Sequence, residues 1–407
     1  MFSKRLDWPF PENRLSALLK RRRGRGAPIF DLTESNPTRV DLPYPRRGLA
    51  EALADPEVAG YQPAPCGLAT ARQAVADLYA RSGHQVPADR IVLTASTSEA
   101  YALLFKILAD PGERVLVPRP SYPLFDYLAA LESLPVAPYP LVYDGRWGID
   151  RAALEETVGA DGARPAAVVA VSPNNPTGST LSRDDTIAID DLCARHGSAL
   201  IADEVFIDYP FPGATAAAAA SATGACGGEA PLSTLASPAG ALTFTLGGLS
   251  KSCGLPQMKL GWIVVRGPEG LVAGALERLE IVCDTYLSVG TPVQRALPRL
   301  LALGEGIRAA IRSRLLENRA ALVAAAGGGS PCRVLHADGG WSAVLQVPAV
   351  TTEEEIALRL LDEDGVLVHP GYFFDFPREA YLIVSLLPRP DRFREGVSRL
   401  LSRLSAG

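Results

Sequence analysis

The residue with the clearest chemical potential is Lys251, which lies in the segment 247–262 (Gly-Gly-Leu-Ser-Lys-Ser-Cys-Gly-Leu-Pro-Gln-Met-Lys-Leu-Gly-Trp). The preceding run 241–246 (Ala-Leu-Thr-Phe-Thr-Leu) predicts a buried strand that ends at two glycines. Desolvation at such a strand end lowers the pKa of a lysine and frees its amine as a nucleophile, as Schiff-base chemistry requires. The alternative is a solvated loop lysine without a chemical role.

Two further polar segments follow predicted buried strands. Residues 172–178 (Ser-Pro-Asn-Asn-Pro-Thr-Gly) follow the apolar run 166–171, and Asp203 ends the run 199–202. Two asparagines between prolines predict a rigid loop with a polar tip. A carboxylate at a buried strand end is costly unless it meets a cation. Because ligands bind at the carboxyl ends of parallel strands, we expect these segments to lie near one another.

A third junction has the composition of an anion site. Residues 90–94 predict a strand and residues 99–108 an apolar helix, with Ala95-Ser96-Thr97-Ser98 between them. Unpaired N–H groups and the positive dipole end of a helix attract phosphate, and the small hydroxyl side chains add donors. Ser96 with Glu99 three residues later also fits a capping box, which is the purely structural interpretation.

The pattern Ser-Lys-x-x-Gly-x-Pro-x-x-[Lys/Arg]-x-Gly-[Trp/Tyr] at 250–262 resembles the lysine signature of the class I/II aminotransferases, the pyridoxal-phosphate family typified by aspartate aminotransferase. The resemblance implies the α/β architecture of fold type I, with a mostly parallel, seven-stranded-type sheet in a large domain and a smaller α+β domain. It divides the chain into an N-terminal arm that joins the small domain (1–45), a large cofactor-binding domain (46–290) and a small domain (291–407). Strand–helix alternation from 90 to 265 agrees with this expectation.

The resemblance also assigns contacts to the cofactor, pyridoxal 5′-phosphate. Lys251 would hold it as a Schiff base, Asp203 would pair with its pyridine nitrogen, and Asn175 would hydrogen-bond its 3′-oxygen. Tyr122 would stack on the ring, with Val205 beneath it. The phosphate would be bound by Ser96, Thr97, Ser250 and Lys259, and by Tyr61 of a neighbouring subunit, which implies a homodimer with shared active sites.

Several of these residues have plainer interpretations. Taken alone, Tyr122 is typical of a core tyrosine and Tyr61 of a surface turn. Three positions depart from the family's pattern: Phe206 replaces a tyrosine that shares the 3′-oxygen, Gly248 replaces a hydroxyl residue, and Lys259 replaces an arginine. The lysine keeps the positive charge but loses the bidentate fork of arginine.

The substrate-binding residues are less determined. Asn36 matches a pocket-lining loop of the family or is a turn asparagine, and Trp341 is a pocket wall or a core tryptophan. Ile383 occupies the position of the arginine that binds the substrate carboxylate in most members. Either another cation substitutes, with Arg39 and Arg389 the candidates, or the substrate has no α-carboxylate there.

The resemblance implies an aminotransferase that moves an amino group between an amino donor and a 2-oxo acid or related carbonyl acceptor. Ile383 keeps a second reaction open on the same fold: a pyridoxal-phosphate-dependent lyase, decarboxylase or cyclase. A cofactor-binding regulator is a further alternative, and the lack of a basic helix-turn-helix-like segment counts against it.

The composition of the chain argues against several other classes of function. The chain has 407 residues, 47% hydrophobic content and a formal net charge of −5, so we expect no nucleic-acid partner. We expect no membrane span and no signal peptide, since there is no long apolar run and no apolar stretch near Met1. Six scattered cysteines favour reduced thiols in a cytoplasmic protein, and four unclustered histidines argue against a metal site. The Ala/Gly-rich segment 213–240 predicts a surface excursion without chemistry.

Overall fold

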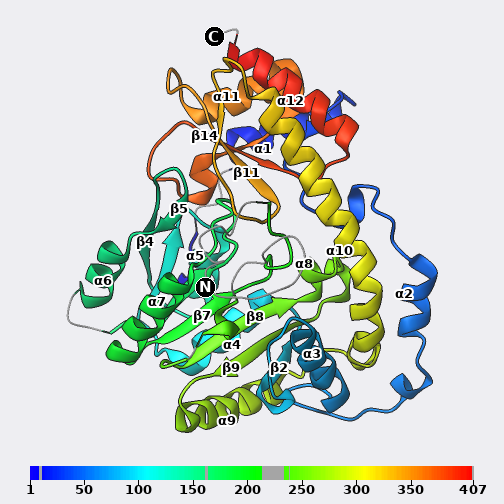
Figure 1. Ribbon diagram of the computed structural model, residues 1–407, viewed down its shortest axis with the longest axis vertical. Helices are drawn as coiled ribbons and strands as arrows, with labels where there is room; N and C mark the ends of the chain where they lie inside the picture. The colour runs from blue at the N-terminus through cyan, green and yellow to red at the C-terminus, as the bar shows by residue number, and fades with distance from the viewer. Residues whose placement is uncertain (9–11, 161–163, 213–232, 238, 406–407) are drawn as a thin grey trace.

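The computed structural model describes residues 1–8, 12–160, 164–212, 233–237 and 239–405. Its largest sheet has the strand order β2-β9-β8-β7-β6-β3-β4-β5 (Figure 1). The strands from β8 to β4 are mutually parallel, β9 is antiparallel to both neighbours, and β5 adds an antiparallel hairpin at one edge. The bounds are β2 Ile91–Thr94, β3 Val115–Arg119, β4 Val136–Tyr143, β5 Trp147–Ile149, β6 Ala167–Val171, β7 Ala199–Asp203, β8 Thr243–Gly248 and β9 Gly261–Arg266.

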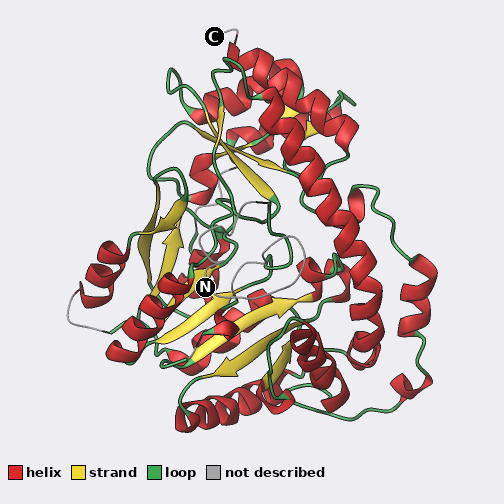
Figure 2. Cartoon of the chain, in the orientation of Figure 1, coloured by secondary structure: helices red, strands yellow, loops and turns green. Residues whose placement is uncertain are grey.

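Helices cover both faces of this sheet (Figure 2), which is why the central parallel strands are apolar along almost their whole length. One face packs against α4 (Thr97–Leu108), α5 (Leu124–Leu131) and α9 (Glu269–Tyr286). The other packs against α6 (Arg151–Gly159) and α7 (Arg183–His196). Of the Ala/Gly-rich segment 213–240, residues 213–232 and 238 lie outside the described residues.

A second, antiparallel sheet has the order β10-β11-β14-β13, with bounds Arg333–Val334, Ser342–Gln346, Tyr381–Ser385 and His369–Pro370. One of its faces packs into the cluster that contains Leu382 and Val384, together with the long helix α10 (Thr291–Ala325) and α12 (Pro390–Ser405). Figure 1 shows α10 running from the large sheet to the second sheet.

The N-terminal arm returns to the C-terminal part of the chain. Its strand β1 (Phe30–Asp31) pairs in parallel with β12 (Val366–Leu367). The remaining α-helices are α1 Arg14–Gly24, α2 Arg46–Leu53, α3 Ala69–Arg81, α8 Leu249–Ser252 and α11 Glu353–Arg359, and a π-helical turn spans Leu360–Asp364. The 3₁₀ turns are Lys4–Leu6, Pro37–Arg39, Pro56–Ala59, Ala88–Arg90, Thr234–Ala236, Pro256–Met258 and Gly371–Phe374.

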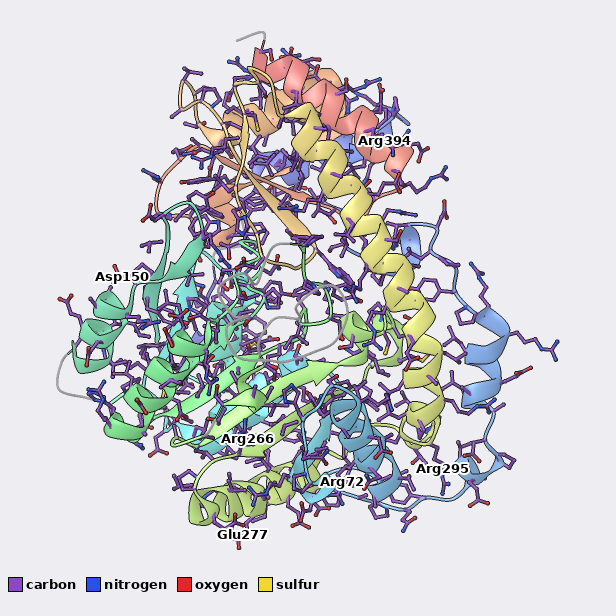
Figure 3. The ribbon with its side chains drawn as sticks, viewed as in Figure 1. Arg72, Asp150, Arg266, Glu277, Arg295 and Arg394 are labelled. Carbon is purple, nitrogen blue, oxygen red and sulfur yellow. The ribbon has the colours of Figure 1, made fainter. Side chains whose placement is uncertain are left out.

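Charged side chains gather on the outside, as Glu277 on α9 and Arg394 on α12 illustrate at opposite ends of the molecule (Figure 3). Among the described residues, no helix combines the length and apolarity that a membrane crossing requires.

Candidate active site

The strand register gathers the segments that the sequence singled out at one edge of the large sheet. Thr94 of β2 and Gly248 of β8 both lie opposite Gly261 of β9. Asp203 at the end of β7 is paired with Val171 on one side and with Leu246 on the other. The segments that follow β2, β6, β7 and β8 therefore leave the sheet side by side.

Lys251 lies on the short helix that follows β8, and aromatic rings surround its amine. The Nζ atom is 4.6 Å from the centre of the Trp341 ring and 5.2 Å from that of Phe206. The Tyr209 hydroxyl donates a 2.5 Å hydrogen bond to the Lys251 carbonyl, fixing the backbone. Burial lowers the pKa of the Lys251 amine to about 8, and the nearby Asp203 carboxylate opposes part of that shift. The amine is thus partly neutral at physiological pH.

Asp203 is a buried carboxylate that is held in place without an ion pair. Its Oδ2 accepts a 3.0 Å hydrogen bond from the hydroxyl of Tyr101 on α4, and its Oδ1 accepts one of 3.2 Å from the N–H of Val205. Burial raises its pKa, while both hydrogen bonds and the Lys251 charge lower it. None of the ion pairs among the described side chains involves Asp203, so a cation at this point would stabilise it.

Ser96 caps α4, as the capping-box interpretation predicted. Its Oγ accepts a 3.1 Å hydrogen bond from the Glu99 N–H, while the Glu99 carboxylate reaches back to the N–H of Ala95 instead of to Ser96 itself. The first N–H groups of the helix have no intrahelical acceptor and point outward. Gly261 allows the chains to meet here, because a Cβ atom would lie 3.2 Å from Thr94 Oγ1 and 3.1 Å from the Gly247 carbonyl.

Lys259 and Ser250 lie between β8 and β9, at the sheet edge where β2 leads into α4. Lys259 is exposed just before β9 and takes part in none of the ion pairs seen between described residues. Ser250 is half-buried on α8, next to Lys251. An ammonium without an ion pair and the first N–H groups of α4 are both groups that attract an anion.

The two asparagines of the loop after β6 have different surroundings. Asn174 is buried, and its amide bonds Ser121 Oγ, the Pro120 carbonyl and Thr177 Oγ1 at 2.7–3.0 Å, which makes it a structural residue. Asn175 is only partly buried, and its Oδ1 accepts a single 3.3 Å hydrogen bond from Ser342 Oγ of β11. Its amide remains available to a ligand. The rings nearby include Tyr122, which is 39% exposed.

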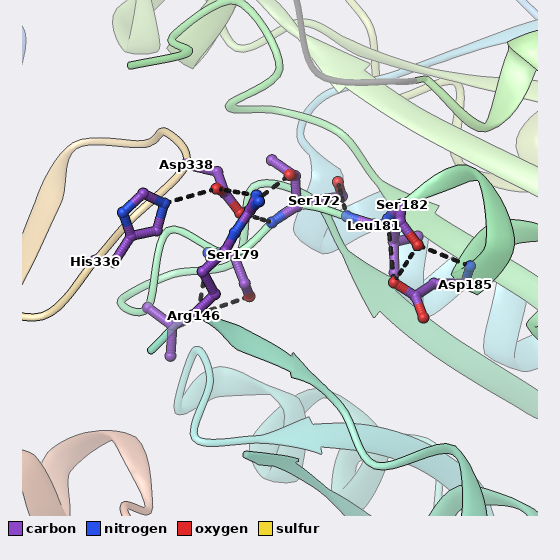
Figure 4. A network of polar contacts seen from close by, with 10 residues as sticks. Arg146, Ser172, Ser179, Leu181, Ser182, Asp185, His336 and Asp338 are labelled. Carbon is purple, nitrogen blue, oxygen red and sulfur yellow. Dashed lines mark hydrogen bonds and ion pairs between the residues drawn. The ribbon is translucent and has the colours of Figure 1, made fainter. Parts of the chain in front are cut away.

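A polar network ties the loop before β11 to this site (Figure 4). Buried Asp338 accepts hydrogen bonds from Arg146 (2.6 Å), from both donors of Thr180 (3.2 Å), and pairs with His336 Nε2 (3.1 Å). Its backbone N–H donates to the Gly178 carbonyl at 2.8 Å. The loop that carries Trp341 is therefore fastened to the asparagine loop.

Known proteins share both the sequence pattern and the fold. The profile of the family "aminotransferase class I and II" matches residues 27–397. The chain belongs to this family. It is 25% identical to the glutamate–pyruvate aminotransferase AlaA of Haemophilus influenzae over 93% of this chain and 91% of that protein. It is 29% identical to the S-alkyl-thiohydroximate lyase SUR1 of Arabidopsis thaliana, but over 63% of this chain and only 52% of that protein. The alanine aminotransferase of Pyrococcus furiosus has the same fold, with a TM-score of 0.86 at 21% identity and full coverage of both chains.

Class I and II aminotransferases depend on pyridoxal phosphate, and the site has the features that this cofactor needs. Asp203 is a buried acid without an ion pair among the described residues, Lys251 is a buried amine with a lowered pKa, and Ser96 begins the helix α4 at the same edge of the sheet. The indole Nε1 of Trp341 is buried without a hydrogen-bond partner. We conclude that the residues fit the group.

Four candidates of the sequence analysis lie apart from this constellation in the described contacts. Asn36 caps the turn Pro37–Arg39 and bonds Thr38. Arg389 is half-exposed and pairs with Asp41 and Asp391. Arg39 is exposed on the same turn. Tyr61 is 78% exposed. Their proposed roles remain predictions.

Sequence reasoning missed the residues that support the site. Tyr101 lies in a helix that the pattern assigned wholly to packing, yet it holds Asp203. Tyr209 was visible in Asp203-Glu-Val-Phe-Ile-Asp-Tyr but carried no signal of its bond to Lys251. Asp338, in Ala-Asp-Gly-Gly, is typical of a turn. Only its burial, at 2% exposure, shows that it holds several loops together.

Proposed function

We propose that the chain is a pyridoxal-phosphate-dependent aminotransferase that moves an amino group between an amino donor and a 2-oxo acid or related carbonyl acceptor. The observation that supports it most is the amine of Lys251, with a pKa lowered to about 8, at the same sheet edge as the unpaired buried acid Asp203. A neutral amine is a nucleophile and a base, and an adjacent carboxylate stabilises a cation.

The cofactor supplies an aldehyde that bonds amines and a ring that accepts electrons. Within the proposal, Lys251 Nζ would hold the aldehyde and would carry a proton to and from the substrate Cα. Asp203 would hold the ring nitrogen in its protonated form, and Tyr101 holds Asp203 by the 3.0 Å hydrogen bond. Asn175 would orient the ring through its amide, and Val205 and Tyr122 would contact the ring.

The phosphate group would be bound by Ser96, Thr97, Ser250 and Lys259. In the same proposal the chain forms a cytoplasmic homodimer in which Tyr61 reaches the phosphate of the partner's site. The 78% exposure of Tyr61 supports a role outside its own subunit. The five cysteines among the described residues are free thiols, as a reducing compartment favours.

The test is a half-reaction followed by absorbance. Purified holoenzyme is mixed with alanine, glutamate and simple amines in turn. A transaminase converts the lysine-bound cofactor into stable pyridoxamine phosphate without net release of ammonia. A lyase or decarboxylase, the reaction that Ile383 kept open, instead returns the lysine-bound spectrum and releases a fragment of the substrate.

Two variants give the controls. Lys251→Ala is expected to lose the lysine-bound absorbance and at least about a thousandfold in rate, because the nucleophile and proton carrier are the same atom. Lys20→Ala, at an exposed position of α1, is expected to match wild type. A Lys251→Ala protein that still transaminates at the wild-type rate would refute the proposal.

A further inference from the structure

One face of the small sheet lies in a buried cluster with residues of the large sheet and reaches the site at Ser342. Ser342 of β11 donates its hydroxyl to Asn175, so its side chain points toward the asparagine loop. Alternate residues of a strand share a face, which puts Val344 on the same side as Ser342. The register pairs Val344 with Ile383 of β14, and Ile383 with His369 of β13. Directly opposed residues of antiparallel strands also share a face.

His369 is the polar group beside Ile383 on this face. Ile383 is 2% exposed and apolar, so it offers a ligand no hydrogen bond. The imidazole of His369 is half-buried, with ring centres of Phe373 and Phe374 at 5.6 and 5.8 Å. Neither ring nitrogen makes a hydrogen bond to any described residue, in contrast to His336, which pairs with Asp338.

His369 also lies next to the loop that carries Tyr122. The segment after β13 ends at Phe374, whose carbonyl accepts a 3.0 Å hydrogen bond from the N–H of Ser121. Ser121 in turn bonds Asn174 through its hydroxyl at 2.7 Å. Backbone and side-chain contacts therefore connect the surroundings of His369 to two loops of the site.

Three arginines, Arg119, Arg146 and Arg308, are already paired with acids. Arg119 pairs with Asp126 and Asp375 at 2.6 and 3.0 Å. Arg146 pairs with Asp338 in the same way, and Arg308 bonds Asp208 at 2.8 Å. Drawing any of them to a substrate would break an existing ion pair. His369 requires no such exchange.

We propose that His369 is the residue that binds the carboxylate of an amino-acid donor, so that the substrate class of this chain is α-amino acids and 2-oxo acids. The inference rests on the proposed function for the identity of the ligand, while its geometry stands on the sheet register. An unbonded imidazole walled by aromatic rings gives a carboxylate a directional partner and excludes water around it.

The electrostatic surroundings predict a proton-linked interaction. Burial lowers the pKa of His369, and the one charge acting against that shift is the carboxylate of Asp31 on β1. The side chains next to its ring are apolar, namely Ile383 of β14 and the rings of Phe373 and Phe374, and the same turn also carries the phenol of Tyr372. The free imidazole is thus neutral at pH 7, and an arriving carboxylate binds together with a proton. Affinity should therefore fall as the pH rises.

The test uses holoenzyme and propionate, a carboxylate without an amine. The chain has four histidines, so their imidazole C–H resonances can be followed by NMR and assigned with variants. Saturating propionate is expected to raise the apparent pKa of the His369 resonance. A wild-type protein in which that resonance does not respond to propionate would overturn the proposal, and this result needs no variant to fold.

Affinity gives the second readout. His369→Gln, which cannot take up a proton, is expected to weaken propionate binding at pH 6 by about tenfold, the loss of one charge-assisted hydrogen bond. Its Kd should be independent of pH between 6 and 8, whereas the wild-type Kd should rise. His196→Gln on α7 is the matched control and should behave as wild type. A loss confined to Arg39→Ala would assign the carboxylate to Arg39 instead and overturn the proposal.

Turnover separates this inference from the proposed function. In His369→Gln, kcat/KM for alanine should fall mainly through KM, whereas that for 1-phenylethylamine, which has no carboxylate, should be unchanged. Equal losses for both donors would mean a structural role for His369 and would contradict the proposal. If wild type transaminates neither donor, the proposed function fails, and propionate binding still decides the role of His369.

Discussion

The surroundings of Lys251 favour the neutral form of its amine. Two ring faces at 4.6 and 5.2 Å stabilise an ammonium by roughly 0.5–2 kcal/mol, and the Asp203 carboxylate acts in the same direction. The pKa is nevertheless lowered to about 8. Desolvation therefore outweighs both favourable interactions, and the amine reaches its neutral, nucleophilic form close to physiological pH.

This balance predicts how the apoprotein captures its cofactor. The rate of pyridoxal phosphate capture should rise about tenfold per pH unit below pH 8, as the neutral amine accumulates, and level off above it. In Asp203→Asn the charge that raises the lysine pKa is gone, so the plateau should begin at a lower pH. Stopped-flow absorbance measures both profiles.

Asp126→Asn, which removes an exposed acid on α5, provides the control and should keep the wild-type profile. A plateau that stays at pH 8 in Asp203→Asn would mean that the two charges do not interact. A plateau that moves to higher pH would contradict the sign of the Coulomb contribution.

Residue types and strand ends were enough to predict that Lys251, Asp203 and Ser96 lie at or just after the ends of strands, because each is a polar group placed after an apolar run. They could not separate Asn174 from Asn175. Both asparagines have the same neighbours in sequence, and only the folded loop turns one toward Ser121 and the other toward the site.

At the scale of elements, two loops hold the site together. Gly178, in the loop after β6, has a positive φ of 67° and receives hydrogen bonds from Asp338 and Gly339 at 2.8 and 3.1 Å. A Cβ atom on Gly178 would lie 2.7 Å from that of Ala337. The close approach brings the loop that ends at Trp341 against the asparagine loop.

We therefore expect Gly178→Ala to destabilise the protein more than a left-handed backbone alone explains. Gly145 also has a positive φ, 73°, but with open space around it. Gly145→Ala should cost about 1 kcal/mol, and Gly178→Ala about 1–3 kcal/mol more because of crowding. Urea unfolding measures both losses in the free energy of unfolding.

Equal losses in the free energy of unfolding of the two variants would show that the two loops can separate without destabilising the protein. Gly178→Ala should also raise the KM of the donor, since Trp341 and Asn175 move with their loops. A destabilised Gly178→Ala variant with an unchanged KM would show that the contact between the loops stabilises the fold but does not affect donor binding.

The alternating pattern of elements was predictable because β6 is apolar, β7 is apolar up to Asp203, and a polar motif stands at the end of each strand. The register of the small sheet was not. β13 has only two residues, too few for a periodic pattern, and its pairing with β14 depends on the turn Gly371–Phe374. The position of His369 beside Ile383 is therefore visible only in the fold.

At the scale of the whole molecule, the arm and the C-terminal third are joined by the pairing of β1 with β12. A further backbone hydrogen bond of 2.6 Å runs from the Ser385 N–H to the Leu32 carbonyl. These contacts favour the proposed grouping of residues 1–45 with 291–407. The boundary at 46 and 290 remains a prediction.

The proposed dimer has a sharper test in the exposed ring of Tyr61. Light scattering should give twice the chain mass of 43.1 kDa. Tyr61→Ala should weaken cofactor binding about tenfold or more, because a hydrogen bond to a charged phosphate is worth roughly 1.5–3 kcal/mol. Equilibrium dialysis of pyridoxal phosphate measures the loss, with Tyr127→Ala, another exposed tyrosine, as the control.

Hybrid dimers decide whether Tyr61 acts across subunits. Consider a dimer of one Lys251→Ala chain and one Tyr61→Ala chain. If each site combines Lys251 of one subunit with Tyr61 of the other, one site contains both substitutions and the other contains both wild-type residues. Half of the sites should then bind the cofactor covalently with wild-type affinity. If Tyr61 acts within its own subunit, every lysine-bearing site of the hybrid keeps the weakened affinity. That outcome would remove the reason for sharing the active site and leave the dimer as an assembly of independent sites.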